Sequence, residues 1–271
     1  HQRVQRVHQK MRRDSSAQEL KLKKRGTAVG GNGRFTRTAQ RTQLIRTIEA
    51  YYRFVPQAFL RLLGKDDITA VELGDQTQRA MTVLFADIRD FTSLSETMTP
   101  KENFAFVNNL LGTVGPVIRT HRGFIDKYMG DGIMALFPED PRDALNATEA
   151  LYQTLARLNA ERGQRGEPAI RIGVGVHAGN LMLGTVGERE RMDGTVIADA
   201  VNVASRLEQL TKQYGASAIV SDAVAQGGGE NFRPLGSIRP KGKQQPIAIF
   251  EFLSADAPAS QRLKQETRAI F

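Results

Sequence analysis

The stretch MTVLFADIRDFT (81–92) decides the fold of this chain. Its first eight residues are a nearly continuous apolar run rich in β-forming side chains, which predicts a central strand covered on both faces. The run ends at Asp87, and the segment FTSLS after it predicts a short helix start. Backbone amides at such a start and a carboxylate at the strand end are suited to phosphate oxygens and a cation, respectively.

A second carboxylate follows in GFIDKYMGDGIMALFP (123–138). This segment predicts a hairpin whose tight turn is Gly130-Asp131-Gly132. A single Asp at a strand end is more often a turn former or a helix cap than a metal ligand. Here the hairpin and the first strand can be neighbours in one sheet, so Asp131 can stand beside Asp87. Two such carboxylates predict a divalent-cation site for in-line phosphoryl chemistry on a nucleotide.

The rest of the chain predicts an α/β fold of the α+β sandwich type. We expect a ferredoxin-like βαββαβ core with extra strands, and an antiparallel-rich sheet with helices on one face. The expected helices are 44–64 interrupted near Pro56, 100–123 kinked or divided at Pro116, 141–161 and 198–215. The expected further strands are a hairpin of 170–179 with 180–187, then 194–198, 217–220, 232–238 and 246–253.

The formal charge of +9 is concentrated near the N-terminus. Residues 1–48 hold 13 Lys and Arg against 2 Asp and Glu, whereas residues 49–271 hold 25 against 27. The basic segment therefore indicates a solvated linker, or a contact with anionic lipid or an upstream element, and not a nucleic-acid-binding domain. We expect a basic, disordered or weakly helical linker (1–41), an amphipathic connecting or dimerising helix (42–77), a catalytic domain (78–254) and a C-terminal tail (255–271).

Several classes of protein are excluded by what the sequence lacks. Without cysteine there is no thiol nucleophile, disulfide or Cys-ligated zinc. The P-loop pattern GxxxxGK[ST] does not occur, and GVGVHAG (173–179) does not match the dinucleotide fingerprint. No apolar run is long enough for a membrane span, and the first residues are too polar for a signal peptide. Because residue 1 is His, we expect a part of a longer protein with upstream domains.

Five linked motifs resemble the catalytic domain of class III nucleotidyl cyclases, and the resemblance covers about residues 78–253. They are VLFADIRDFTSLSE, GFIDKYMGDGIMALF, RIGVGVHAGNLMLGTVG, DGTVIADAVNVASRLE and RPKGKQQPIAIFEF. The resemblance implies adenylate cyclase activity, the conversion of ATP to cyclic AMP and pyrophosphate. It also implies two Mg²⁺ or Mn²⁺ ions per site, held by Asp87, Asp131 and the backbone carbonyl of Ile88.

The same resemblance assigns the nucleotide contacts. Phe91 and Thr92 match the turn whose amides meet the terminal phosphates. Lys241 matches a phosphate-binding lysine, with Lys243 as a close rival. Lys127 and Thr195 match the base-selecting pair: the lysine can donate to adenine N1, and the hydroxyl can accept from the exocyclic amine, so ATP is the expected substrate.

Asn202 and Arg206 match the pair that acts on the transition state. They are four residues apart on one expected helix and hence share a face. Asn202 would orient the ribose, and Arg206 would stabilise charge on the α-phosphate. The resemblance further implies a head-to-tail homodimer, in which one chain supplies the two aspartates and the other supplies Lys127, Thr195 and this pair.

Thr195 stands where many adenylyl members of the family have Asp. This departure resembles the soluble, bicarbonate-responsive subgroup, so bicarbonate is an expected activator, and discrimination of ATP from GTP is expected to be looser. We expect a cytoplasmic location, with the cytoplasmic face of a membrane as an alternative, and an upstream sensor domain. The alternatives left open are a guanylate cyclase and a catalytically silent regulatory module. A diguanylate cyclase is disfavoured, because MGDGIM replaces its GGDEF-type turn.

Overall fold

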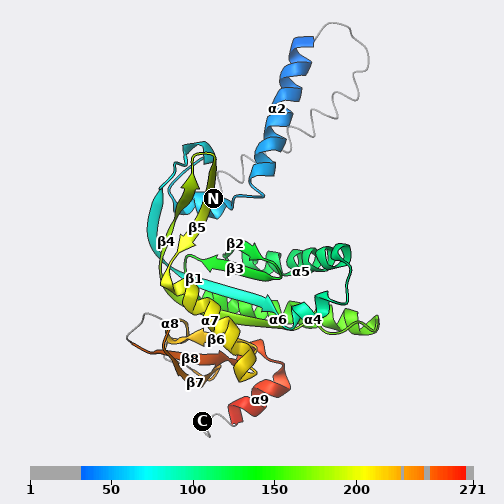
Figure 1. Cartoon of the computed structure of the whole chain (residues 1–271), viewed down its shortest axis with the longest axis vertical. Helices are drawn as coiled ribbons and strands as arrows, with labels where there is room; N and C mark the ends of the chain where they lie inside the picture. The colour runs from blue at the N-terminus through cyan, green and yellow to red at the C-terminus, as the bar shows by residue number, and fades with distance from the viewer. Residues whose placement is uncertain (1–31, 227–228, 241–244, 267–271) are drawn as a thin grey trace. The chain divides into compact units, whose positions relative to one another are not determined.

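The computed structural model describes residues 32–226, 229–240 and 245–266 (Figure 1). The chain divides into two compact units between Phe54 and Val55. The first unit contains helix α2 (Asn32–Tyr51), which begins inside the segment expected to be a linker. No helix of the described ranges is long and apolar enough to cross a membrane. The predictions for residues 1–31, Lys241, Lys243 and the last five residues concern parts of the chain that the structure does not describe.

The second unit alternates helices and strands in the order that the sequence predicts. Its helical elements are α3 (Gln57–Leu62), η1 (Ile68–Ala70), α4 (Phe91–Ser95), α5 (Pro100–Thr120), α6 (Pro141–Gln164), α7 (Asp199–Tyr214), α8 (Asp222–Ala225), η2 (Leu253–Ala255) and α9 (Pro258–Glu266). Its strands are β1 (Gln76–Ile88), β2 (Phe124–Met129), β3 (Gly132–Phe137), β4 (Ile172–Glu188), β5 (Arg191–Ile197), β6 (Ala218–Ser221), β7 (Phe232–Ile238) and β8 (Ile247–Phe252).

The eight strands form one sheet of order β2-β3-β1-β4-β6-β8-β7, with β5 paired to β4. Strand β1 lies inside the sheet, antiparallel to β3 and β4, and its apolar run is buried as predicted. Only the pairing of β4 with β6 is parallel among these strands. The predicted mixed fold with a largely antiparallel sheet is therefore confirmed.

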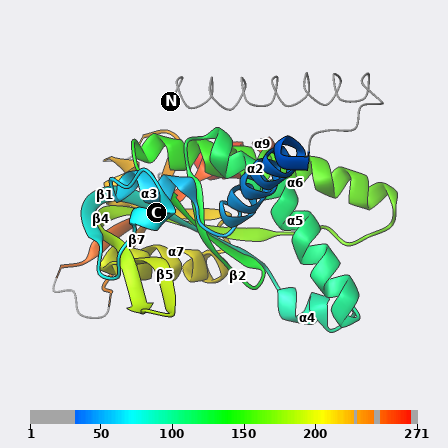
Figure 2. The same ribbon diagram turned by 90° about the horizontal axis from the view of Figure 1, so that it is seen from above.

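Helices cover both faces of this sheet, which corrects the expectation of one covered face. Helices α5 and α6 pack on one face, over residues of β1, β3 and β4 such as Leu84, Ala135 and Val174. Helix α7 and the short α3 pack on the other face, against residues such as Val83 and Leu183. Figures 1 and 2 show α6 and α7 on opposite sides of the strands. The reason is that β1 is buried along both faces, so each face needs its own cover.

The hairpin expected between 170–179 and 180–187 is wrong. Residues 172–188 form the single strand β4, which pairs with β1 from Ile172 to Gly184. Gly179 and Asn180, the expected turn, lie opposite Met81 and Ala80 in this ladder. Because β1 begins at Gln76, earlier than expected, its backbone groups continue to bond β4 through this point. The hairpin is instead formed by β4 and β5.

The expected division of a helix at Pro116 is also wrong, since α5 runs without interruption from Pro100 to Thr120. A proline inside a helix removes one N–H donor and crowds the carbonyl four residues earlier. That carbonyl belongs to Gly112, which is exposed, so water can bond it and no side chain adds to the crowding.

Helix α7 lies unusually close to β4 at two glycines. A Cβ atom built on Gly175 would overlap the backbone of Ala204 and Glu208, and one built on Gly173 would overlap the side chain of Thr211. Both glycines are buried and belong to the same face of β4. Residues without side chains are therefore required for this helix to rest on the sheet.

We expect Gly175→Ala to lower the free energy of unfolding by about 1–3 kcal/mol, because the added methyl group meets helix backbone that cannot turn aside. Chemical denaturation of this variant, of a matched control variant and of the wild type measures the change. The matched control is Gly112→Ala, whose added Cβ meets nothing within 4 Å. That change should stabilise by about 0.5–1 kcal/mol, since alanine is the better helix former. A Gly175→Ala protein as stable as the wild type would contradict the close packing.

Candidate functional site

The structure brings Asp87 and Asp131 together, as the sequence predicts. Asp87 lies at the end of β1, and Asp131 lies in the turn between β2 and β3. Gly130 adopts φ +67°, and a Cβ atom on Gly132 would lie 2.9 Å from Asp87 Oδ1. Burial raises the pKa of Asp87 to about 6, with the charge of Asp131 and a hydrogen bond between the two carboxyl groups as further causes. Two carboxylates that repel each other in this way suit a divalent cation, which relieves the repulsion.

The pair would need further oxygen ligands from backbone or substrate. In the described part of the chain, no group of three or more His, Cys, Asp or Glu side chains is arranged to hold a metal ion. Ile88, whose carbonyl is the predicted third ligand, is the last residue of β1 and pairs with Ile172 of β4. The cation ligands that the sequence predicts here are therefore oxygens alone, which suits Mg²⁺ or Mn²⁺.

Glu208 is a third carboxylate near this pair, and the sequence reading missed it. It lies on α7 with its Oε1 against Gly173, the register partner of Asp87. Burial and, to a lesser extent, the charge of Asp87 raise the pKa of Glu208 to about 7, while the charge of Arg89 opposes the rise. The signal in the sequence was the alternation of glycines in GVGVHAG, which allows a helix to approach the strand end.

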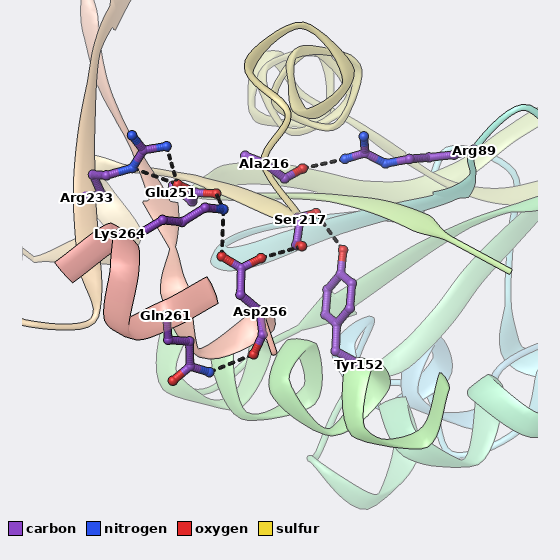
Figure 3. A network of polar contacts seen from close by, with 9 residues as sticks. All are labelled: Arg89, Tyr152, Ala216, Ser217, Arg233, Glu251, Asp256, Gln261 and Lys264. Atoms are coloured by element: carbon purple, nitrogen blue, oxygen red, sulfur yellow. Dashed lines mark hydrogen bonds and ion pairs between the residues drawn. The ribbon is translucent and has the colours of Figure 1, made fainter. Parts of the chain in front are cut away.

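Arg89, two residues after Asp87, connects the end of β1 to the loop that follows α7 (Figure 3). Its guanidinium donates to the carbonyls of Ile172 and Ala216. The neighbouring Ser217 donates to Asp256, and its carbonyl lies 2.5 Å from the Tyr152 hydroxyl. Arg89 thereby fixes the end of β1 against the loop that follows α7.

The same network anchors the C-terminal helix α9 (Figure 3). Lys264 of α9 lies 2.6 Å from Glu251 and 2.8 Å from Asp256, and Arg233 also pairs with Glu251. The Glu251 side chain is fully buried, so its charge requires both cations. The described part of α9 is therefore packed on the domain rather than separate from it.

The predicted phosphate turn begins at Asp90, which has φ 59° and precedes α4. Its carboxylate pairs with Arg171 and with Lys212 of α7. The Phe91 ring stacks on Phe106 of α5, with centroids 6.4 Å apart. Thr92 is exposed. Phe91 and Thr92 thus form the start of α4, three residues after Ile88, where a bound phosphate would be close to a cation held at Asp87.

Lys127 and Thr195 are also brought together. They come from β2 and β5, and Lys127 Nζ donates a 2.9 Å hydrogen bond to Thr195 Oγ1. Lys127 remains 38 % exposed, so one of its N–H groups can reach a ligand. An ammonium donor beside a hydroxyl, with both partly open, can bind the edge of a heterocyclic base.

Asn202 and Arg206 lie one turn apart on α7, and both are exposed. Arg206 Nη1 is 3.4 Å from Gln209 Oε1. Within the described ranges, neither side chain forms a hydrogen bond or ion pair with the aspartates or with Lys127 and Thr195. They are thus presented to the outside of this chain, on a helix whose opposite face is buried.

The comparison with protein families gives one match that covers most of the second unit. A family described as "Adenylate and Guanylate cyclase catalytic domain" matches residues 73–250. The adenylate cyclase of Anabaena cylindrica is 44 % identical over 219 residues, which is 77 % of this chain and 44 % of that protein. This chain spans less than half the length of the first curated relatives that it matches.

Two solved structures have the same fold. The guanylyl cyclase Cya2 superimposes with a TM-score of 0.57 at 28 % identity, over 67 % of this chain and 95 % of that one. The adenylyl cyclase CyaB from P. aeruginosa superimposes with a TM-score of 0.56 at 28 % identity, over 65 % and 94 % of the two chains. Because the family match covers well over half of its residues, this chain belongs to the adenylate and guanylate cyclase catalytic domain family.

Proposed function

We propose that this chain is an adenylate cyclase catalytic domain that converts ATP to 3′,5′-cyclic AMP and pyrophosphate. The observation that carries the proposal is the presence, in one domain, of the paired carboxylates Asp87 and Asp131 and the bonded pair Lys127 and Thr195. The first pair suits a metal-bound triphosphate, and the second suits adenine. Similarity to a curated adenylate cyclase supports the same activity.

In the proposed reaction the ribose 3′-oxygen attacks the α-phosphorus, the bond to the bridging oxygen breaks, and pyrophosphate leaves. Two divalent cations held by Asp87, Asp131 and the Ile88 carbonyl would assist the attack and neutralise the triphosphate. The amides of Phe91 and Thr92 are suited to the terminal phosphates, and Lys241 is proposed to reach them as well. Asn202 orients the ribose, and Arg206 stabilises the charge that develops on the α-phosphate.

GTP is the second candidate substrate, because the guanylyl cyclase Cya2 is a close structural relative. Lys127 favours ATP. Its ammonium has only donors, which match adenine N1, whereas the corresponding guanine position is itself an N–H donor. Thr195 accepts the lysine bond and retains a second lone pair for the exocyclic amine of adenine.

We also propose that the active form is a homodimer of this chain. The outer parts of β2, β4 and β5 carry exposed apolar side chains, which a single domain does not need. They are Tyr128, Met129, Met182, Val186, Met192 and Ile197. Met182 and Ile197 are opposite each other in the β4–β5 ladder, so they form a continuous surface. Such a surface fits a second cyclase domain.

A bicarbonate activator, an upstream sensor and a membrane contact of the basic segment stay predictions from the sequence.

We expect the wild-type chain to form cyclic AMP from ATP with Mg²⁺ or Mn²⁺, at a higher kcat/KM than cyclic GMP from GTP. Asp87→Ala should abolish both activities, because the metal-bound triphosphate loses a carboxylate ligand. Product chromatography measures this directly. Asp66→Asn, which removes an exposed carboxylate, is the control and should retain full activity. Cyclic AMP formation by Asp87→Ala would contradict the assignment.

The metal-free protein should lose stability as pH rises from about 4 to about 6, because folded Asp87 holds its proton more tightly than the unfolded chain does. The contribution of Asp87 to stability is fully present below the pKa of its carboxyl group in the unfolded chain. It is lost above the pKa of the same group in the folded protein. Between these pH values, the midpoint of thermal unfolding should fall less for Asp87→Asn than for the wild type. Above pH about 6, Mn²⁺ should raise the midpoint of the wild type only. Equal responses of the two proteins to Mn²⁺ would argue against cation binding at this pair.

The shared-site dimer is tested by complementation. Asp87→Ala and Arg206→Ala should each lose on the order of 100-fold or more in kcat. Mixed as exchanging dimers in equal amounts, they should recover about a quarter of wild-type activity, because half of the dimers hold one intact site. Gln213→Ala, an exposed change on the same helix, should not lose activity and serves as the control. Without recovery in a verified heterodimer, the two groups of residues would belong to one chain's site.

A further inference from the structure

Asp126 is a buried carboxylate next to the base-selecting Lys127, and no role has been assigned to it above. Its side chain is only 2 % exposed, and its Oδ2 accepts no hydrogen bond. That oxygen lies 3.4 Å from Lys127 Nζ, which is an ion-pair distance. Burial raises the pKa of Asp126, and the charge of Lys127 opposes the rise. In the described part of the chain, Lys127 is the cation paired with this carboxylate.

A β-bulge makes this neighbourhood possible. Ile125 pairs with Ala135 and Lys127 pairs with Met134, so Asp126 is an extra residue on β2. In a regular strand, successive side chains point to opposite faces, which would separate Asp126 from Lys127. A bulge interrupts the alternation and redirects a side chain, and bulges of this kind occur beside active sites.

Lys127 Nζ consequently has two partners within the protein, and its third N–H remains available to a ligand. One N–H is donated to Thr195 Oγ1 at 2.9 Å, and the charge of Asp126 attracts the ammonium from behind. Lysine has a long flexible side chain, so a single hydrogen bond to a hydroxyl would hold its position weakly. A carboxylate that is closed to solvent cannot touch a bound base and can act only through Lys127.

We infer that Asp126 is a positioning residue for nucleotide selection, which holds the Lys127 ammonium beside Thr195 so that its free N–H meets adenine N1. The inference rests on the proposed function, since it assigns Lys127 to the base.

The burial of Asp126 supports a functional role rather than a structural one. A buried carboxylate oxygen without a hydrogen bond costs folding free energy. Asp193, two residues before Thr195 on β5, adds further repulsion. A residue kept at such a cost is expected where its charge serves the site.

The test compares wild type, Asp126→Asn, Lys127→Met and the double variant, with kcat and KM measured for ATP and for GTP. Asp126→Asn should raise the KM for ATP and lower the ATP over GTP preference in kcat/KM on the order of tenfold, with kcat little changed. Its melting temperature should stay equal or rise, because a buried carboxylate oxygen without a hydrogen bond is removed. In the Lys127→Met background, Asp126→Asn should change the preference no further. Asp66→Asn is the control.

The outcomes distinguish an error in the proposed base-selecting pair from an error in the role of Asp126. If Lys127→Met leaves the preference for ATP unchanged, or if the wild type has none, the base-selecting pair is wrong and this inference is overturned with it. If Lys127→Met lowers the preference while Asp126→Asn does not, only the role of Asp126 is overturned. Equal losses for ATP and GTP in Asp126→Asn, or additive effects in the double variant, would also overturn it. Equilibrium binding of ATP and GTP to the same variants in an Arg206→Ala background provides a readout that does not depend on turnover.

Discussion

The close packing of helix α7 on strand β4 is the constraint on which the site depends. Gly173 and Gly175 present no side chains, so the helix backbone rests directly on the sheet. Gly173 is the register partner of Asp87, and the same helix carries Asn202 and Arg206 on its outer face. One contact therefore sets how far Asn202 and Arg206 stand from the strand that ends at Asp87. A larger residue at either glycine would move this helix away from the sheet.

The domain concentrates acidic groups in places where burial works against their charge. Asp87 and Glu208 both have raised pKa values, because they are partly buried close to each other and to Asp131. Asp126 has a raised pKa behind Lys127. These groups differ from Glu251, whose buried charge is compensated by Arg233 and Lys264. The acids with raised pKa values lie around the proposed nucleotide site, and the doubly paired Glu251 lies in the structural network of the C-terminal part. This distribution follows the general rule that groups with shifted pKa values cluster at sites of binding and chemistry.

The two ends of the domain are connected through Arg89. Its bonds to the carbonyls of Ile172 and Ala216 join the end of β1 to the loop before β6, and Ser217 and Asp256 continue the connection to α9. The position of Asp87 is thus supported through bonds of Arg89 that span 83 and 127 residues of sequence. This support fixes the end of β1 that carries Asp87, whereas Asn202 and Arg206 of α7 remain exposed.

The sequence by itself determined the order and type of most elements, because apolar runs, glycines and prolines act over a few residues. It also identified Asp87, Asp131, Lys127 and Thr195 as candidates, and the structure brings them together in two pairs. Only the tertiary structure decided that 172–188 is one strand, since the length of β1 controls that pairing. It alone decided that α7 covers the second face of the sheet, and that Asp126 is turned inward beside Lys127 by a bulge. These features arise from contacts between distant segments, and no local pattern of residues encodes such contacts.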